Sequence, residues 1–210
     1  QWLRPVVDFS FYARETIFGF IPYEANFYML SFIGLFYVSF AYFAILKPES
    51  FGRLTVAVIL QQALGSLAYM VAPALGPFIY EKGLNEFVSG GQDAMFLFNE
   101  NAVTHGTGYL AQHGGEWFTA GLAAMPSLHT AGAVLFLLFA WREAKALVPI
   151  FAFAVVFILV TSVATRWHYI IDLPVGMLLA WFCYTIANKA RDGRLAAPER
   201  QPAQSSVIGT

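Results

Sequence analysis

Two histidines, His129 and His168, stand beside apolar stretches of this 210-residue chain, and His168 has an acidic neighbour at helical spacing. Asp172 follows His168 by four residues, which places both side chains on one face of a helix, one turn apart. A carboxylate in that position accepts the proton on one imidazole nitrogen and leaves the other nitrogen free as a nucleophile or base. The pair therefore predicts nucleophilic or acid–base chemistry at His168.

The other histidine ends the segment MPSLH, residues 125–129. Proline is favoured in the first turn of a helix, where the backbone N–H groups have no partners. Together with the Ser127 hydroxyl, those N–H groups are suited to hold phosphate oxygens. Arg166, two residues before His168, adds a guanidinium that matches a phosphoryl group through two parallel hydrogen bonds. These residues predict phosphoryl transfer, with Ser127 and Arg166 binding the substrate phosphate.

The elements that position these residues are apolar helices. Hydrophobic residues make up 58% of the chain and charged ones 12%, and the mean hydropathy is +0.59. Five stretches approach the ~20 residues that a helix needs to cross a hydrocarbon core of ~30 Å. They cover residues 26–46, 54–73, 122–141, 147–165 and 168–188. Because segments such as FAFAVVFILV have no polar face, the sequence predicts an all-α polytopic membrane protein of five or six transmembrane helices.

Charge and cysteine content exclude other classes of protein. The net charge of −1 and the pI of about 6.5 lack the basic excess of a nucleic-acid-binding protein. The single cysteine, Cys183, lies in an apolar stretch, so one chain forms neither a disulfide nor a cysteine metal site. Residues 9–22 mix aromatic residues with Arg14 and Glu15, a pattern typical of a helix that lies in the membrane interface. We therefore do not count that segment as a span.

Basic residues indicate how the chain is oriented in the membrane. When the five stretches are threaded back and forth, eight of the twelve basic residues fall on one side, which is then expected to be cytoplasmic. The two histidines share the opposite side, where ionisable groups usually face a cavity and have a function. We expect a plasma or inner membrane protein whose site faces the non-cytoplasmic side. The eight residues are Lys47, Arg53, Arg142, Lys145, Lys189, Arg191, Arg194 and Arg200.

Two polar segments flank the predicted bundle. Residues 78–121 form the one long hydrophilic loop, on the outer side, with aromatic residues between polar ones. This composition favours short helices on the membrane surface, either as a plain cap or as a lid that selects substrate. Residues 191–210 are polar and contain prolines, which predicts a disordered cytoplasmic tail. The membrane-embedded domain that carries the site is therefore expected over residues 1–190.

The histidine segments resemble motifs of a known superfamily. MPSLH at 125–129 and RWHYIIDLPVG at 166–176 are similar to the second and third motifs of the type 2 phosphatidic acid phosphatases, which usually read Pro-Ser-Gly-His and contain His-x-x-x-Asp. MPSLH followed by HYxxD most resembles the branch of inositol phosphorylceramide synthases and related lipid phosphotransferases. Residues 69–77 (YMVAPALGP) are similar to the region before the first motif in that branch. The resemblance covers about 55–188.

The resemblance implies a mechanism. His168 attacks phosphorus to give a phosphohistidine, Asp172 orients and stabilises it, and His129 protonates the leaving oxygen. Water, or an alcohol such as inositol, then takes the phosphoryl group while His129 acts as base. The substrate is a lipid phosphate or phosphodiester, and no metal or other cofactor is implied. Hydrolysis and transfer use the same residues, so the sequence leaves both open.

The chain departs from the superfamily where the phosphate is held. The first motif, Lys-x6-Arg-Pro, is not found before the outer loop, and Ser162 stands where the third motif has an arginine. Arg166 is the expected substitute, and Arg4, Arg14 and Lys82 are the other cations on the outer side. These departures keep a second interpretation open, a non-catalytic membrane binding or scaffold protein derived from the same fold.

Overall fold

The computed structural model describes residues 2–24, 26–71, 73–114 and 123–195, and within these ranges the protein is helical with no strand. Leu75 and Ala123 form an isolated β-bridge. The all-α class predicted from the sequence is confirmed. The elements are α1 (Arg4–Thr16), α2 (Phe27–Leu46), α3 (Pro48–Val71), η1 (Pro77–Ile79), α4 (Glu86–His113), α5 (Leu128–Glu143), η3 (Lys145–Leu147), α6 (Val148–Ala164) and α7 (Asp172–Leu195).

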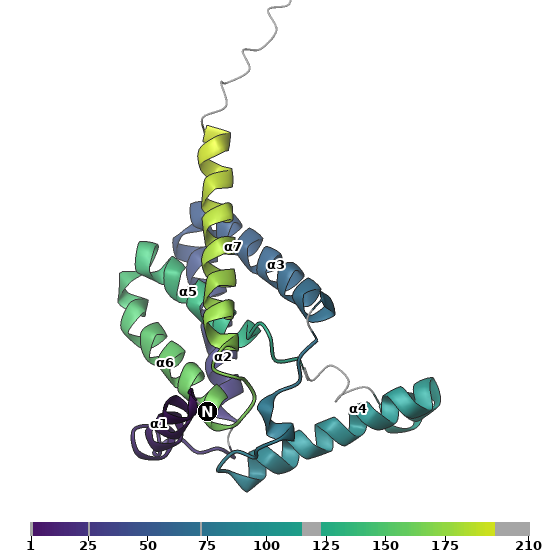
Figure 1. Ribbon diagram of the computed structural model, residues 1–210. Coiled ribbons are helices and arrows are strands. Elements are labelled where there is room, and N and C mark those ends of the chain that lie inside the picture. Colours follow the sequence, from purple (N-terminus) through teal and green to yellow (C-terminus); the bar gives the residue numbers. More distant parts are fainter. Residues whose placement is uncertain (1, 25, 72, 115–122, 196–210) are drawn as a thin grey trace, which may run out of the picture.

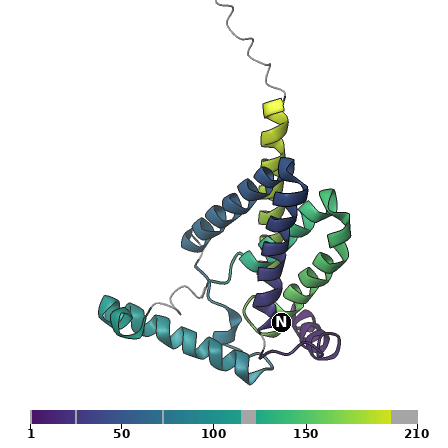
Figure 2. The ribbon, with the colours of Figure 1, turned by 180° about the vertical axis from the view of Figure 1, so that it is seen from behind.

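Helix α5 is the centre of the bundle and packs against α2, α3, α6 and α7 (Figures 1 and 2). Its first turns carry small residues, and small residues let neighbouring helices approach closely. A Cβ on Gly132 would lie 2.7 Å from the Phe32 ring of α2. A Cβ on Gly176 of α7 would lie 2.5 Å from the backbone oxygen of Ser127. The start of α7 is therefore in direct contact with the start of α5, where both predicted motifs lie.

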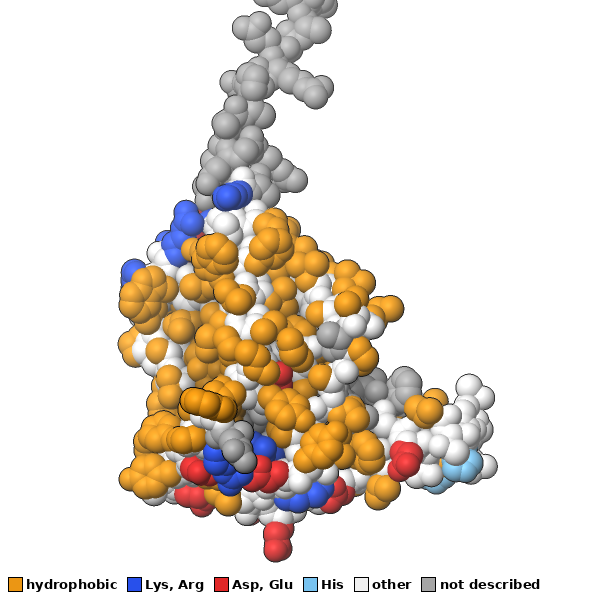
Figure 3. All heavy atoms as spheres, in the orientation of Figure 1, with side chains coloured by type: hydrophobic (Ala, Val, Ile, Leu, Met, Phe, Trp, Pro, Cys, Tyr) orange, Lys and Arg blue, Asp and Glu red, His pale blue; other side chains and the backbone are white. Residues whose placement is uncertain are grey.

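Three helical segments are long and apolar enough to cross a membrane: Phe27–Leu46, Pro48–Val71 and Lys145–Ala164. α5 has 16 residues, fewer than the ~20 that span a hydrocarbon core, and it lies inside the bundle. The larger number of five or six spans, in which α5 and α7 also cross, stays a prediction. In Figure 3 hydrophobic side chains cover the body of the bundle, and Lys and Arg gather near the end where α7 leaves it. This surface is that of a membrane protein.

Helices α1 and α4 lie at the end of the bundle opposite the exposed end of α7 (Figure 1). α1 packs against α6 and buries Val7, Ala13 and Arg14, while Phe9 and Tyr12 on its other face are exposed. That two-faced pattern agrees with the predicted interfacial helix, and α1 is not among the three helices suited to cross a membrane.

Most of the outer loop is α4, which consists of two helical segments joined at a kink, a longer one before Gly106 and a shorter one after it. Asn85 begins this helix by accepting a hydrogen bond from the Val88 N–H, at 3.0 Å. Gly106, at φ 64° and ψ −149°, has a non-helical backbone conformation and forms the kink between the two segments. α4 passes under the bundle and projects beyond it (Figures 1 and 2).

The last helix is longer than the sequence suggested. α7 continues to Leu195, so residues 191–195, which were assigned to the tail, extend this helix. The remainder of the predicted tail, 196–210, lies outside the described residues.

Candidate active site

Backbone contacts fix the segment that precedes α5. The Ala124 N–H donates to the Ala74 oxygen at 2.7 Å, and the Tyr69 hydroxyl donates to the Pro126 oxygen at 3.0 Å. The Ser127 N–H donates to the backbone oxygen of Asp172, at 3.3 Å. The segment before α5 is therefore held by residues 69–75 on one side and by the first residue of α7 on the other.

His168 lies in the turn between α6 and α7, not in the helix that the sequence predicted to start there. α7 begins four residues later, at Asp172, so the expected arrangement of His168 and Asp172 on one helix is wrong. The chain reverses direction in this turn, where Arg166 has a φ of 62°, and the His168 N–H donates to the Ser162 oxygen at 3.2 Å. The histidine is thus positioned by backbone contacts of the turn.

The ring of His168 has a defined tautomer. Its Nδ1 lies 2.8 Å from the carbonyl oxygen of Ala124, and a carbonyl oxygen only accepts hydrogen bonds. Nδ1 therefore carries a hydrogen, and in the neutral ring Nε2 has the lone pair. The side chain is 6% exposed and lines a cavity. This is the protonation that a nucleophilic imidazole requires.

Asp172 still lies beside the histidine, although it is not the nearest acceptor. Its Oδ2 is 3.5 Å from His168 Nδ1 and accepts a hydrogen bond from the Tyr169 N–H at 2.8 Å. The carboxylate is 1% exposed. A negative charge at this distance would stabilise the positive ring of a phosphorylated His168.

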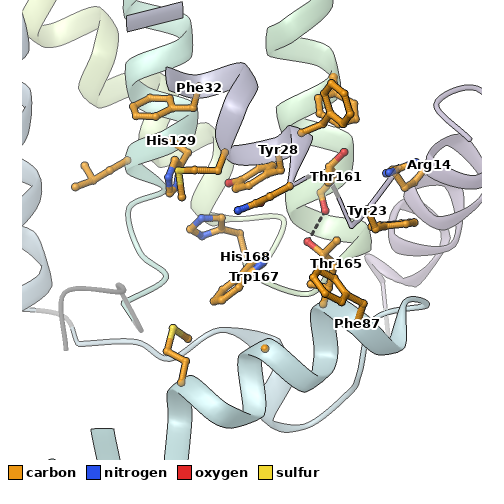
Figure 4. A pocket seen from close by; sticks show the side chains of 18 of the residues that line it. Arg14, Tyr23, Tyr28, Phe32, Phe87, His129, Thr161, Thr165, Trp167 and His168 are labelled. Atoms are coloured by element: carbon orange, nitrogen blue, oxygen red, sulfur yellow. Dashed lines mark hydrogen bonds between the residues drawn. The ribbon is translucent and has the colours of Figure 1, made fainter. Parts of the chain in front are cut away.

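His129 is the second residue of α5 and lines the same cavity. Its ring packs against two rings of α2, with centroid distances of 5.3 Å to Tyr28 and 4.9 Å to Phe32. Figure 4 shows the rings of His129 and His168 close to each other at one side of the hollow. The structure thus brings together two histidines that are 39 positions apart in the sequence.

The cavity has a volume of about 860 Å³ and mostly apolar walls. Phe27 and Phe32 of α2, Met95 and Phe87 of α4, and Phe157 of α6 contribute to the lining. A cavity of this size holds a small-molecule ligand or a lipid head group with the start of its chains. α4 is therefore part of the wall of the candidate site.

Ser127 and Arg166 are not among the residues that line this cavity. The Ser127 hydroxyl caps α5 by accepting from the Thr130 N–H, and it donates to the Thr130 hydroxyl at 3.0 Å. Arg166 Nη2 pairs with Glu81 Oε2 at 2.7 Å, and Glu81 also accepts from Arg4 Nη1 at 2.6 Å. Contact of either residue with a substrate phosphate stays a prediction.

Among the other outer-side cations that the sequence named, Arg14 alone lines the cavity. Arg4 pairs with Asp8 and Glu81, and Lys82 pairs with Asp93. The sequence named Arg14 as an outer-side cation in an interfacial helix, without placing it at the site. The signal in the sequence that points to it is a cation within a run of aromatic residues.

Comparison with known proteins agrees with these motifs. A family model described as the PAP2 superfamily matches residues 13–186. The chain therefore belongs to the PAP2 superfamily, whose members are generally phosphatases or phosphotransferases. No curated protein and no solved structure gives a significant match. The inositol phosphorylceramide synthase-like branch stays a prediction.

Proposed function

We propose that this protein is an integral membrane lipid phosphotransferase or lipid phosphate phosphatase that works through a phosphohistidine on His168. The observation that carries the proposal is the hydrogen bond from His168 Nδ1 to the Ala124 oxygen, because it leaves Nε2 as the free nucleophile beside a cavity. Membership of the PAP2 superfamily supports the same class of reaction.

In the proposed first step, Nε2 of His168 forms a bond to phosphorus as the bond from phosphorus to the leaving oxygen breaks. His129 gives a proton to that oxygen. In the second step, water or an alcohol attacks phosphorus, His129 accepts its proton, and the phosphorus–nitrogen bond breaks. Asp172 stabilises the positive ring of the intermediate from 3.5 Å away.

The apolar walls of the cavity favour a lipid phosphate or phosphodiester as substrate. An alcohol such as inositol is the acceptor that the resemblance implies, and water is the other. The proposed site faces the non-cytoplasmic side of a plasma or inner membrane, in a bundle of five or six spans. The uneven distribution of basic residues supports this orientation.

The deciding experiment gives the detergent-purified protein a panel of lipid phosphates, with and without inositol, and measures free phosphate against inositol phosphate. Free phosphate identifies a phosphatase, and inositol phosphate identifies a transferase. The matched control is His168→Ala. A third outcome is that the protein gives neither product, traps no phosphoenzyme and still binds the lipids. That result would identify it as the non-catalytic binding or scaffold protein, the interpretation that the absence of the first motif keeps open.

A further inference from the structure

Three residues that line the cavity each have a polar atom that is buried without a hydrogen-bond partner among the described residues: Arg14 Nε, Thr161 Oγ1 and Tyr28 Oη. They come from α1, α6 and α2, three separate elements. An unpaired buried polar atom destabilises a protein by about 1–3 kcal/mol, so native structures hold few of them. Three in the lining of one cavity point to a ligand with polar groups.

Arg14 is the strongest indication of a bound ligand, because its side chain has a positive charge as well as an unpaired donor. The residue is 1% exposed, and its Nη1 and Nη2 donate to the backbone oxygens of Phe18 and Ile21 at 2.9 and 2.7 Å. Its guanidinium lies 3.8 Å from the centroid of the Tyr23 ring. Within the described residues no carboxylate lies within 4.0 Å of it. A buried cation without a counter-ion is unfavourable unless an anion binds beside it.

Thr161 adds a neutral donor near the same place. It is 2% exposed and lies in the last turn of α6, where the Thr165 hydroxyl donates to its backbone oxygen at 2.7 Å. In a helix a threonine hydroxyl ordinarily bonds to the backbone one turn earlier, as Thr165 does. The Thr161 hydroxyl is without such a partner and is available to a ligand.

Tyr28 packs against His129, whereas Arg14 lies away from both histidines within the same cavity. Figure 4 shows Arg14 and Tyr23 on one side of the hollow and His129 and His168 on the other, with Thr161 and Thr165 between them. Resting on the proposed function, we propose that the Arg14 end of the cavity binds a second anionic group of the lipid substrate, separate from the phosphoryl group that His168 attacks. The preferred substrate then has two anionic groups in its head group.

The test is equilibrium binding of two lipids to the full-length protein in detergent, in a His168→Ala background that consumes neither. Phosphatidic acid has one phosphate in its head group, and phosphatidylglycerol phosphate has two, separated by a glycerol. We expect the second lipid to bind at least about tenfold more tightly, as one charge-assisted hydrogen bond allows. Arg14→Gln should remove most of that difference, and Arg14→Lys should keep part of it.

Thr161→Val is the second variant, because it keeps the side-chain shape and removes a hydroxyl that has no partner within the described part of the chain, so the fold should be retained. Its matched control is Ser39→Ala on α2, since the Ser39 hydroxyl is also buried and unpartnered but lies outside the cavity lining. We expect Thr161→Val to weaken only the binding of phosphatidylglycerol phosphate, by about threefold to tenfold, and Ser39→Ala to weaken neither lipid.

Two results would overturn the inference: equal binding of both lipids by the parent protein, or equal weakening of both lipids by Arg14→Gln and Thr161→Val. Neither result contradicts the proposed function, because that function is tested by turnover and phosphoenzyme formation in the wild-type protein. Loss of that turnover, with the lipid preference intact, would reject the mechanism and keep the binding site.

Discussion

The backbone oxygen of Ala124 lies 2.8 Å from Nδ1 of His168, although 44 residues separate them in the chain. This contact joins the segment before α5 to the turn before α7. It also sets which ring nitrogen carries the hydrogen, so the reactivity of His168 depends on a backbone atom that no side-chain substitution removes.

His168→Ala should lower turnover by more than about 10⁴-fold and abolish any phosphoenzyme, because the variant lacks the attacking nitrogen. The measurement is release of labelled phosphate, together with acid-labile label on the protein after rapid quenching. His105→Ala is a matched control, since His105 is exposed on α4. If His168→Ala still forms a phosphoenzyme, another residue is the nucleophile.

Asp172→Asn should reduce kcat by about 10²–10⁴-fold while leaving the fold intact. The amide oxygen can still accept from the Tyr169 N–H, but it no longer provides the negative charge 3.5 Å from the ring of His168. Single-turnover kinetics should show slower formation of the phosphoenzyme. If the rate is unchanged, the carboxylate serves only to begin α7.

Arg166 and Glu81 should behave as a pair. Because the guanidinium is held by Glu81 at 2.7 Å, we expect Arg166→Ala and Glu81→Gln each to reduce kcat by roughly tenfold, through movement of the turn that holds His168. Arg166→Lys should recover only part of this effect, since an ammonium keeps the charge opposite Glu81 but not the shape and reach of the guanidinium.

If Arg166 instead contacts the substrate phosphate, as the sequence predicted, the two variants should differ in kcat. Loss of one charge-assisted donor to the transition state reduces kcat by about 10²–10³-fold. If Arg166→Ala loses about 10²–10³-fold in kcat while Glu81→Gln has normal turnover, then Arg166 binds the substrate. Its pairing with Glu81 would then not be what supports activity.

Gly176→Ala should destabilise the protein by about 1–3 kcal/mol, because the new Cβ would lie 2.5 Å from the Ser127 oxygen and push α7 away from α5. The control is Gly34→Ala on α2, where a Cβ meets nothing within 4 Å. Thermal unfolding in detergent measures both. Equal melting temperatures for the two variants would show that α5 and α7 tolerate a wider separation.

Cysteine labelling tests the orientation. In a Cys183→Ala background, Gly108→Cys on α4 should react with an impermeant thiol reagent outside intact cells, and Ala146→Cys in η3 should react only after lysis. Both positions are exposed. The reverse pattern would place the candidate site on the cytoplasmic side.

The sequence predicted the helical class and the two histidine segments, because long apolar stretches and short polar motifs are local properties. It did not predict that most of the outer loop is two helical segments joined at Gly106, since a glycine is compatible with ending a helix as well as with a kink between two helices. Nor could it predict the partner of His168 Nδ1. That partner is a carbonyl oxygen, which every residue has, so residue types do not identify it.

Arg14 was missed as a cavity residue for a related reason. Its spacing within the chain fits an exposed interfacial helix, and its burial follows only from the packing of α1 on α6. Whether such a cation is solvated or buried depends on contacts between elements that are distant in the sequence. The periodicity of one helix does not reveal those contacts.

Helix α4 is attached to the rest of the molecule mainly near its first turns. The amide of Gln92 donates to the Thr165 oxygen at 2.8 Å, and Phe87 and Met95 line the cavity, whereas the Val103 side chain farther along is 81% exposed. One wall of the cavity is thus the core around α5, and the other is a helix from the outer loop. Substitutions in α4 can therefore change the shape of the cavity without changing His129, His168 or Asp172.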